Sequence, residues 1–312
     1  MNQSVAPNQR WYSITHETTY TYSDRVKSSF GRGFLTPRGF DGQDVLESSV
    51  TVDPSPADQS TGRDVYGNED VFFHVTRDHE KLVVTARSLV CVDAPDPARI
   101  AGWNATGPWE NARPRAWSSM LDVGRAMAVE FELDLVPPEI TDDVREYAAV
   151  SFTPGRPLVD AVVDLTHRIF TDFTYKSGST TVSTKVAEVL QARSGVCQDF
   201  ARLALACLRS VGLAGRYVSG YLATQPPPGK ERMIGVDATH AWAAVWLPGD
   251  TWLAFDPTND QLVDERYTTV AWGRDYQDVP PLRGIIYTEA DKSTISVSVD
   301  VEPLPTAPIR AV

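Results

Sequence analysis

The spacing of hydrophobic and polar residues divides the chain into two parts. In the first part, short runs rich in β-branched and aromatic residues are separated by Gly and Pro; they are Arg10–Tyr22, Val45–Val52, Val71–Val75 and Lys81–Val92. Such runs are typical of half-buried strands. We therefore expect an N-terminal β domain, sandwich-like or barrel-like, over residues 1–105.

Helical spacing dominates the following segment. Apolar residues recur at steps of three and four over Pro157–Phe170, which predicts a helix. A short helix is expected at Val186–Ala192. A longer helix is expected from Cys197 to about Val211, where Gly212 provides a stop.

Strand patterns return after this helix, at Arg216–Leu222, His240–Leu247 and Trp252–Phe255, and Ser293–Val301 alternates polar and apolar residues. The order of elements indicates an α+β protein. After the β domain we expect a helical or loop connector over residues 106–155, a core over 156–265, and a C-terminal extension with one strand over 266–312.

Composition narrows the possible functions. The 312 residues carry 29 Lys and Arg against 41 Asp and Glu, a net charge of −12, which argues against nucleic acid or an anionic membrane as partner. No run of 18 uncharged apolar residues is present, and the first ten residues lack the apolar core of a signal peptide. We expect a cytoplasmic protein; the oligomeric state stays open.

The three cysteines, Cys91, Cys197 and Cys207, do not suggest a disulfide framework. Cys197 and Cys207 share one predicted helix, where ten residues separate them by about 15 Å, far beyond disulfide reach. Cys207 lies on the apolar stripe of that helix and Cys91 in an apolar β run, so both are expected to pack in the core. Cysteine chemistry would therefore come from one free thiol.

Cys197 is the candidate nucleophile because it lies where a loop becomes a helix. Backbone N–H groups in the first turn of a helix have no partner within the helix, and the macrodipole there is positive. Both effects stabilise a thiolate. Gly195 permits a tight turn before the sulfur. By itself the position is only suggestive, because most free cysteines are small buried hydrophobic residues.

His240 is the candidate base, and Asp256 is the candidate group that orients it. If Leu247 pairs with Thr251 across a turn at 248–250, Trp242 faces Asp256, and His240 becomes its diagonal neighbour on the same face. One imidazole nitrogen then reaches Asp256 and the other points towards Cys197. A slip of one residue would place Asp256 on the opposite face, in which case it would merely end a strand.

Three blocks of sequence resemble the transglutaminase-like family of bacteria, a branch of the papain-like cysteine enzymes: Ser194–Leu222, Ala238–Trp246 and Trp252–Asp260. Residues 11–92 resemble the N-terminal β domain often fused to this core, and 273–280 resembles a tail of the same subgroup. The resemblance implies a papain-like core in which the helix-start Cys197 packs against an antiparallel sheet that carries His240 and Asp256.

The same resemblance implies acyl transfer on amide bonds of a peptide or protein through a Cys197–His240–Asp256 triad, without a metal or other cofactor. The backbone N–H of Cys197 is expected to stabilise the oxyanion, with Tyr175 as a candidate second donor. Trp242 is a candidate wall of the substrate site. Arg216 and Asp199 are expected to form a structural pair.

Three functions remain open at this stage. Water as acceptor makes the protein a peptidase or amidase, which the resemblance favours, whereas a lysine amine makes it a cross-linking transglutaminase. A scaffold without activity on the same fold is the third possibility, because fold alone does not fix function.

Overall fold

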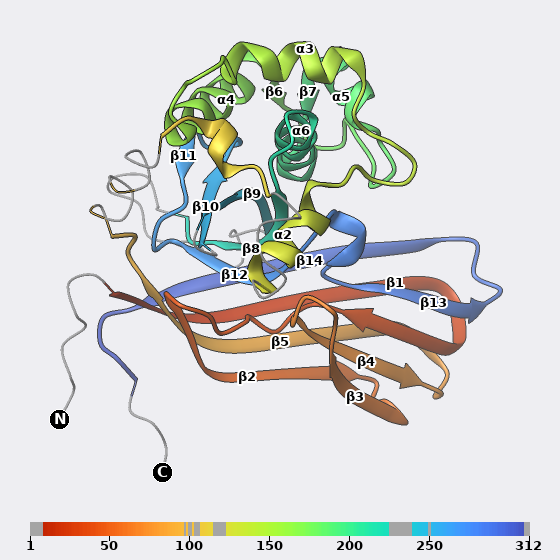
Figure 1. Ribbon diagram of the computed structural model, residues 1–312. Helices are drawn as coiled ribbons and strands as arrows, with labels where there is room; N and C mark the ends of the chain where they lie inside the picture. The colour runs from red at the N-terminus through yellow and green to blue at the C-terminus, as the bar shows by residue number, and fades with distance from the viewer. Residues whose placement is uncertain are drawn as a thin grey trace, which may run out of the picture.

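The computed structural model describes residues 9–96, 98, 102, 107–114, 123–224, 239–248 and 251–308. A group of helices covers one face of a five-stranded sheet, and a larger β structure lies beneath that sheet (Figure 1). The sequence prediction of an α+β protein with an N-terminal β-rich region is confirmed.

The N-terminal β domain is organised around the 25-residue strand β1 (Gln9–Gly33). The first half of β1 pairs with β5 (His79–Asp93) and β14 (Ser293–Leu304). Its second half pairs with β4 (Glu69–Val75) and β13 (Arg283–Thr288). At the outer edges, β2 (Gln43–Asp53) pairs with β5 and β3 (Asp58–Arg63) pairs with β4.

The pairing of β1 is irregular near its middle. Its register shifts between Thr21 and Val26 against β5 and between Val26 and Ser28 against β13, and extra residues at such points bend a strand. Side chains of β1, β4 and β5 bury one apolar cluster there, which makes the domain sandwich-like. Its buried members are Tyr22, Val26, Leu35, Val52, Val71, Phe73, Val75, Leu82, Val84 and Ala86.

The predicted end of the first strand at Tyr22 is wrong, because β1 continues through Gly31 and Gly33. A Cβ at Gly31 would lie 2.1 Å from a ring atom of Phe73, and one at Gly33 would lie 2.3 Å from the carbonyl oxygen of Pro281. These glycines therefore provide space for close neighbours inside a strand and do not mark a turn.

The core contains a sheet of order β11-β10-β9-β8-β12. Its central helix α6 (Cys197–Ser210) packs on β8 and β9 mainly through apolar side chains, and its buried Arg209 donates a hydrogen bond to the carbonyl of Gly215 in β8. The predicted helices and strands of this region are confirmed within one or two residues. The remaining elements are η1 (Trp109–Ala112), α2 (Val123–Glu132), α3 (Asp142–Ser151), α4 (Leu158–Asp172), β6 (Thr174–Tyr175), α5 (Val186–Ala192), β7 (Ser194–Gly195), β8 (Gly215–Leu222), β9 (Thr239–Leu247), β10 (Thr251–Asp256), β11 (Gln261–Leu262), β12 (Tyr267–Gly273) and η2 (Tyr276–Asp278).

The end of the chain is shared between the two sheets. Strand β12 joins the core sheet beside β8, whereas β13 and β14 return to β1 and lie among the N-terminal strands (Figure 1). The segment 266–312, which the sequence pattern grouped as one extension, therefore contributes to both parts of the protein. None of the described helices is long and apolar enough to span a membrane.

The two parts share one continuous core. Tyr12 and Ile14 of β1 belong to the same buried cluster as Leu203 of α6. A polar contact crosses the same interface: the buried His16 hydrogen-bonds through Nδ1 to the hydroxyl of Tyr221 at 2.9 Å. The N-terminal domain is thus a structural support of the core.

The pH dependence of stability should report on His16. Burial lowers the pKa of His16 to about 4, from 6.5 for an unperturbed histidine. The unfolded chain therefore binds this proton first as the pH falls, and folding loses at most about 3 kcal/mol between pH 6.5 and 4. We expect His16→Gln to reduce the loss of stability between pH 7.5 and 4.5 in urea denaturation. Equal losses in both proteins would contradict this prediction.

Candidate active site

Cys197 is held at the start of α6 by a clamped turn. Strand β7 just before it pairs in parallel with β6, placing Tyr175 opposite Gly195. The carboxylate of Asp199 accepts hydrogen bonds from the backbone N–H of Val196 at 2.8 Å and from the hydroxyl of Thr180 at 2.6 Å. Cys197 is partly exposed, whereas Cys91 and Cys207 are buried. The thiol at the helix start is therefore the accessible one.

The predicted register of the β9–β10 hairpin is confirmed. Leu247 pairs with Thr251, and the pairing continues to Ala243 opposite Phe255; two of the three turn residues, at 249 and 250, lie outside the described residues. This register brings His240 to the carboxylate expected to orient it: its Nε2 lies 2.6 Å from Oδ2 of Asp256.

The carboxylate of Asp256 is fully buried, and both of its oxygens accept hydrogen bonds. Besides His240, its Oδ2 accepts hydrogen bonds from Asn259 at 2.6 Å and from the hydroxyl of Tyr267 at 2.8 Å, and its Oδ1 accepts one from the backbone N–H of Thr258 at 2.8 Å. Burial alone would raise the pKa of Asp256, but the hydrogen bonds and the charge of His240 lower it below its ordinary value. The group is thus an anion.

His240 connects this anion with the thiol. Burial disfavours its charged form, but hydrogen bonds to Asp256 and Cys197, together with their negative charges, raise the pKa of His240 to about 10. Nε2 is the nitrogen that contacts Asp256, so the contact of Nδ1 with Cys197 stays a prediction. The arrangement can hold an imidazolium beside a carboxylate, as an oriented base for a cysteine nucleophile requires.

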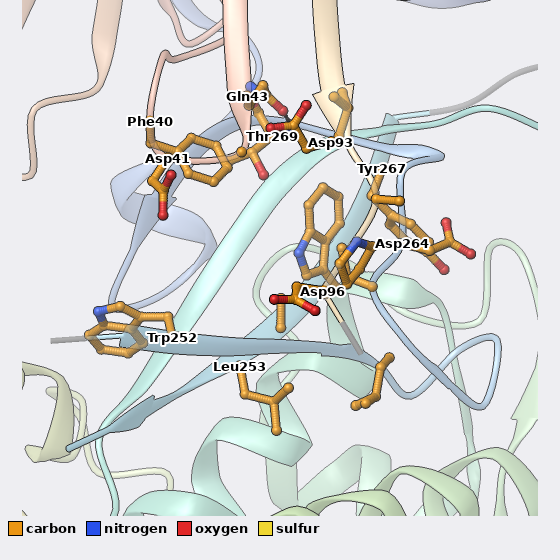
Figure 2. Close-up of a pocket in the computed structure, with 18 residues that line it drawn as sticks. Phe40, Asp41, Gln43, Asp93, Asp96, Trp252, Leu253, Asp264, Tyr267 and Thr269 are labelled. Atoms are coloured by element: carbon orange, nitrogen blue, oxygen red, sulfur yellow. Dashed lines mark hydrogen bonds between the residues drawn. The ribbon is translucent and has the colours of Figure 1, made fainter. Parts of the chain in front are cut away.

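Trp242, the predicted wall of the substrate site, is 1% exposed and packs with its ring centroid 6.1 Å from that of His240. It also lines a cavity of about 370 Å³. Figure 2 shows Tyr267 and Asp264 on one side of this cavity and Trp252 and Asp41 on the other. Among the described lining residues neither Cys197 nor His240 occurs, so contact of Trp242 with substrate stays a prediction.

Tyr175 lies near the start of the helix that carries Cys197. It pairs opposite Gly195, two residues before Cys197, and its side chain is 54% exposed. The pKa of Tyr175 is raised overall, because burial and the charge of Cys197 outweigh the opposite effect of a hydrogen bond to Ser177. Its role as a second oxyanion donor stays a prediction.

The expected pair of Arg216 and Asp199 is wrong. Asp199 is at the start of α6 and is bonded to Val196 and Thr180. The guanidinium of Arg216 lies on the other face of the sheet, 3.7 Å from the ring centroid of Trp252. A strand alternates its side chains between faces, so Arg216 points away from the helix that Tyr217 touches.

Sequence reasoning missed Asn259 and Tyr267, both of which bond to Asp256. Asn259 follows Asp256 by three residues, a spacing at which a side chain can turn back onto the end of a strand, and this signal was available. Tyr267 lies in β12, which carried no recognised strand pattern, so its proximity depends on the tertiary fold.

The other four histidines have partners away from Cys197. His16 bonds to Tyr221, His74 to Ser28, His79 to Ser29, and the exposed His167 to Asp260 at 2.8 Å. Among the described residues, no group of three or more His, Cys, Asp or Glu side chains is arranged to hold a metal ion.

Comparison with known proteins agrees with this geometry. Residues 12–91 match the bacterial transglutaminase-like N-terminal region, and residues 147–257 match the transglutaminase-like superfamily. An uncharacterized protein from Mycobacterium tuberculosis (strain ATCC 25618 / H37Rv) is 61% identical over 296 residues, which cover 94% of this chain and 92% of the relative.

Two further proteins show more distant similarity. A protein-glutamine gamma-glutamyltransferase from Pseudomonas aeruginosa is 34% identical over 79 residues, which cover 25% of this chain and 12% of that enzyme. The crystal structure of a candidate cysteine protease from Cytophaga hutchinsonii has a TM-score of 0.71 at 18% identity and covers 98% of this chain and 93% of that one, which shows the same fold. With its N-terminal region and its core both matched, the chain belongs to the bacterial transglutaminase-like family.

Proposed function

We propose that this protein is a cysteine-dependent acyl-transfer enzyme that hydrolyses amide bonds of a peptide or protein. The proposal rests on the buried imidazole of His240: its Nε2 lies 2.6 Å from the Asp256 carboxylate, and Asp256 and the helix-start Cys197 both raise its pKa. A packing role for the cysteine alone would not require a charged histidine and a buried, fully bonded carboxylate beside it.

The acylation step follows from these positions. The Cys197 thiolate, paired with the imidazolium of His240, attacks the carbonyl carbon of the amide through Sγ. The tetrahedral oxyanion accepts a hydrogen bond from the backbone N–H of Cys197, which lies in the first turn of α6, where such donors have no carbonyl partner within the helix. When the C–N bond breaks, His240 donates its proton to the leaving amine.

Deacylation reverses these roles. His240 removes a proton from a water molecule, whose oxygen attacks the thioester carbonyl. The C–S bond then breaks, and the thiolate leaves while the proton stays on His240. Throughout, Asp256 holds the ring in one orientation and stabilises its positive charge.

A lysine amine as acceptor is the second candidate, and the similarity of one quarter of the chain to a protein-glutamine gamma-glutamyltransferase supports it. The triad chemistry is the same for both acceptors. Proteolysis and cross-linking therefore differ only in which nucleophile reaches the thioester.

Selective alkylation tests the nucleophile. We expect iodoacetamide at pH 7 to modify Cys197 at least about tenfold faster than Cys91 or Cys207 in the folded protein, because burial raises the pKa of these two thiols to about 11 and about 12. Peptide mass spectrometry against time gives the three rates. Similar slow rates for all three would favour a scaffold without activity.

A peptide library, offered with and without a primary amine, tests the reaction. Cys197→Ala should lower the rate of product formation by about 10³-fold or more, because no covalent intermediate can form. Cys91→Ala is the matched control and should retain activity. Hydrolysis products without amine incorporation support the peptidase or amidase; incorporated amine supports the cross-linking enzyme, and equal activity of Cys197→Ala contradicts both.

The pH profile tests the role of Asp256. With the pKa of His240 raised to about 10, activity should persist at alkaline pH and decline only as the imidazolium is lost. Asp256→Asn removes the charge that favours the imidazolium, so this alkaline limit should move to lower pH and kcat should fall by about 10²–10⁴-fold. An unchanged profile in the variant would exclude Asp256 from the mechanism.

A further inference from the structure

We propose that Tyr267, a residue outside the three motif blocks, is a positioning residue that fixes the Asp256 carboxylate through a directed chain of hydrogen bonds from Arg266 and Gln261. This inference rests on the proposed function, since it assigns a task in orienting His240. The site is the same, but Gln261, Arg266 and Tyr267 come after residues 147–257, which match the transglutaminase-like superfamily.

The chain of contacts is continuous and short. The hydroxyl of Tyr267 lies 2.8 Å from Oδ2 of Asp256 and accepts a hydrogen bond from Nε2 of Gln261 at 2.5 Å. Oε1 of Gln261 accepts a hydrogen bond from a guanidinium nitrogen of Arg266 at 2.9 Å. Arg266 is in turn held by the carboxylate of Asp264, at 2.6 Å.

The direction of every bond is fixed by chemistry. A guanidinium only donates, so the group of Gln261 that faces Arg266 must be its carbonyl oxygen. The amide nitrogen therefore points to Tyr267 and donates to it. The hydroxyl oxygen of Tyr267 accepts this bond, and its proton is donated to the carboxylate of Asp256, which can only accept. This series of hydrogen bonds therefore makes the hydroxyl of Tyr267 a donor to the carboxylate of Asp256.

Tyr267 reaches Asp256 from a distant strand. In the sheet order, β12 and β10 are separated by β8 and β9, so the tyrosine ring lies across the sheet face. The ring is 2% exposed and is packed edge-to-face against Trp242, with centroids 5.3 Å apart. Figure 2 shows it beside Asp264 at the edge of the cavity. Such packing leaves the hydroxyl little freedom to leave the carboxylate.

Removing one hydroxyl tests this role. In Tyr267→Phe, the carboxylate loses the contact that holds its plane and can rotate away from Nε2 of His240. We expect this loss of alignment to outweigh the greater basicity of the carboxylate. We expect the pKa of His240, followed by NMR of ¹³C-histidine-labelled protein, to fall by about half a unit or more. The rate of Cys197 alkylation should fall by about tenfold. Loss of the His240 signal in His240→Gln provides the assignment.

Tyr221→Phe is the matched control, because it also removes a buried tyrosine hydroxyl, one that bonds to His16 and not to Asp256. It should change the NMR signal of His16 and leave the titration of His240 and the alkylation rate unaltered. Should Tyr267→Phe fail to fold, Gln261→Met frees the hydroxyl rotor without removing it, and a smaller decrease in the pKa of His240 is expected.

The outcomes separate this inference from the proposed function. A His240 titration that is unchanged or moves to higher pH in Tyr267→Phe overturns the positioning role. A wild-type protein whose Cys197 alkylates no faster than its buried cysteines overturns the proposed function, while the titration still decides whether Tyr267 acts on His240.

Discussion

The candidate site depends on a carboxylate that is completely removed from water yet remains charged. An isolated carboxylate in that position would take up a proton, because burial penalises the anion. Four donors prevent this at Asp256: an imidazole, an amide, a phenol and a backbone N–H. The anion can then hold His240 as an imidazolium, and the imidazolium in turn favours a thiolate at Cys197.

The fold supplies these donors from separate parts of the chain. His240 begins one strand of the hairpin, Asp256 ends the other, and Tyr267 comes from the far edge of the sheet. Helix α6 is held against this sheet by apolar side chains. Two ion pairs also hold it, because the buried Arg202 pairs with Glu139 at 3.2 Å and with Asp275 at 2.8 Å. Because breaking a buried pair leaves an unpaired charge, this network resists displacement of the helix that carries the thiol.

The N-terminal domain supports the core. Its strand β1 pairs with the last strand of the chain and packs on the core, and His16 bonds to Tyr221 of β8 across that interface. Strand β12, which carries Tyr267, is followed by η2 and then by β13 and β14, which return to β1.

Local sequence patterns were enough to predict three features: the helix that begins at Cys197, its end near Gly212, and the hairpin register that joins His240 to Asp256. These features depend on helix termini and on pairing across a short turn, so neighbouring residues suffice to predict them. Only the tertiary structure decided the passage of β1 through Gly31, the return of β13 and β14 to the first sheet, and the bond from Tyr267 to Asp256. Each of these depends on contacts between residues far apart in the chain, such as Phe73 over Gly31, for which local spacing carries no signal.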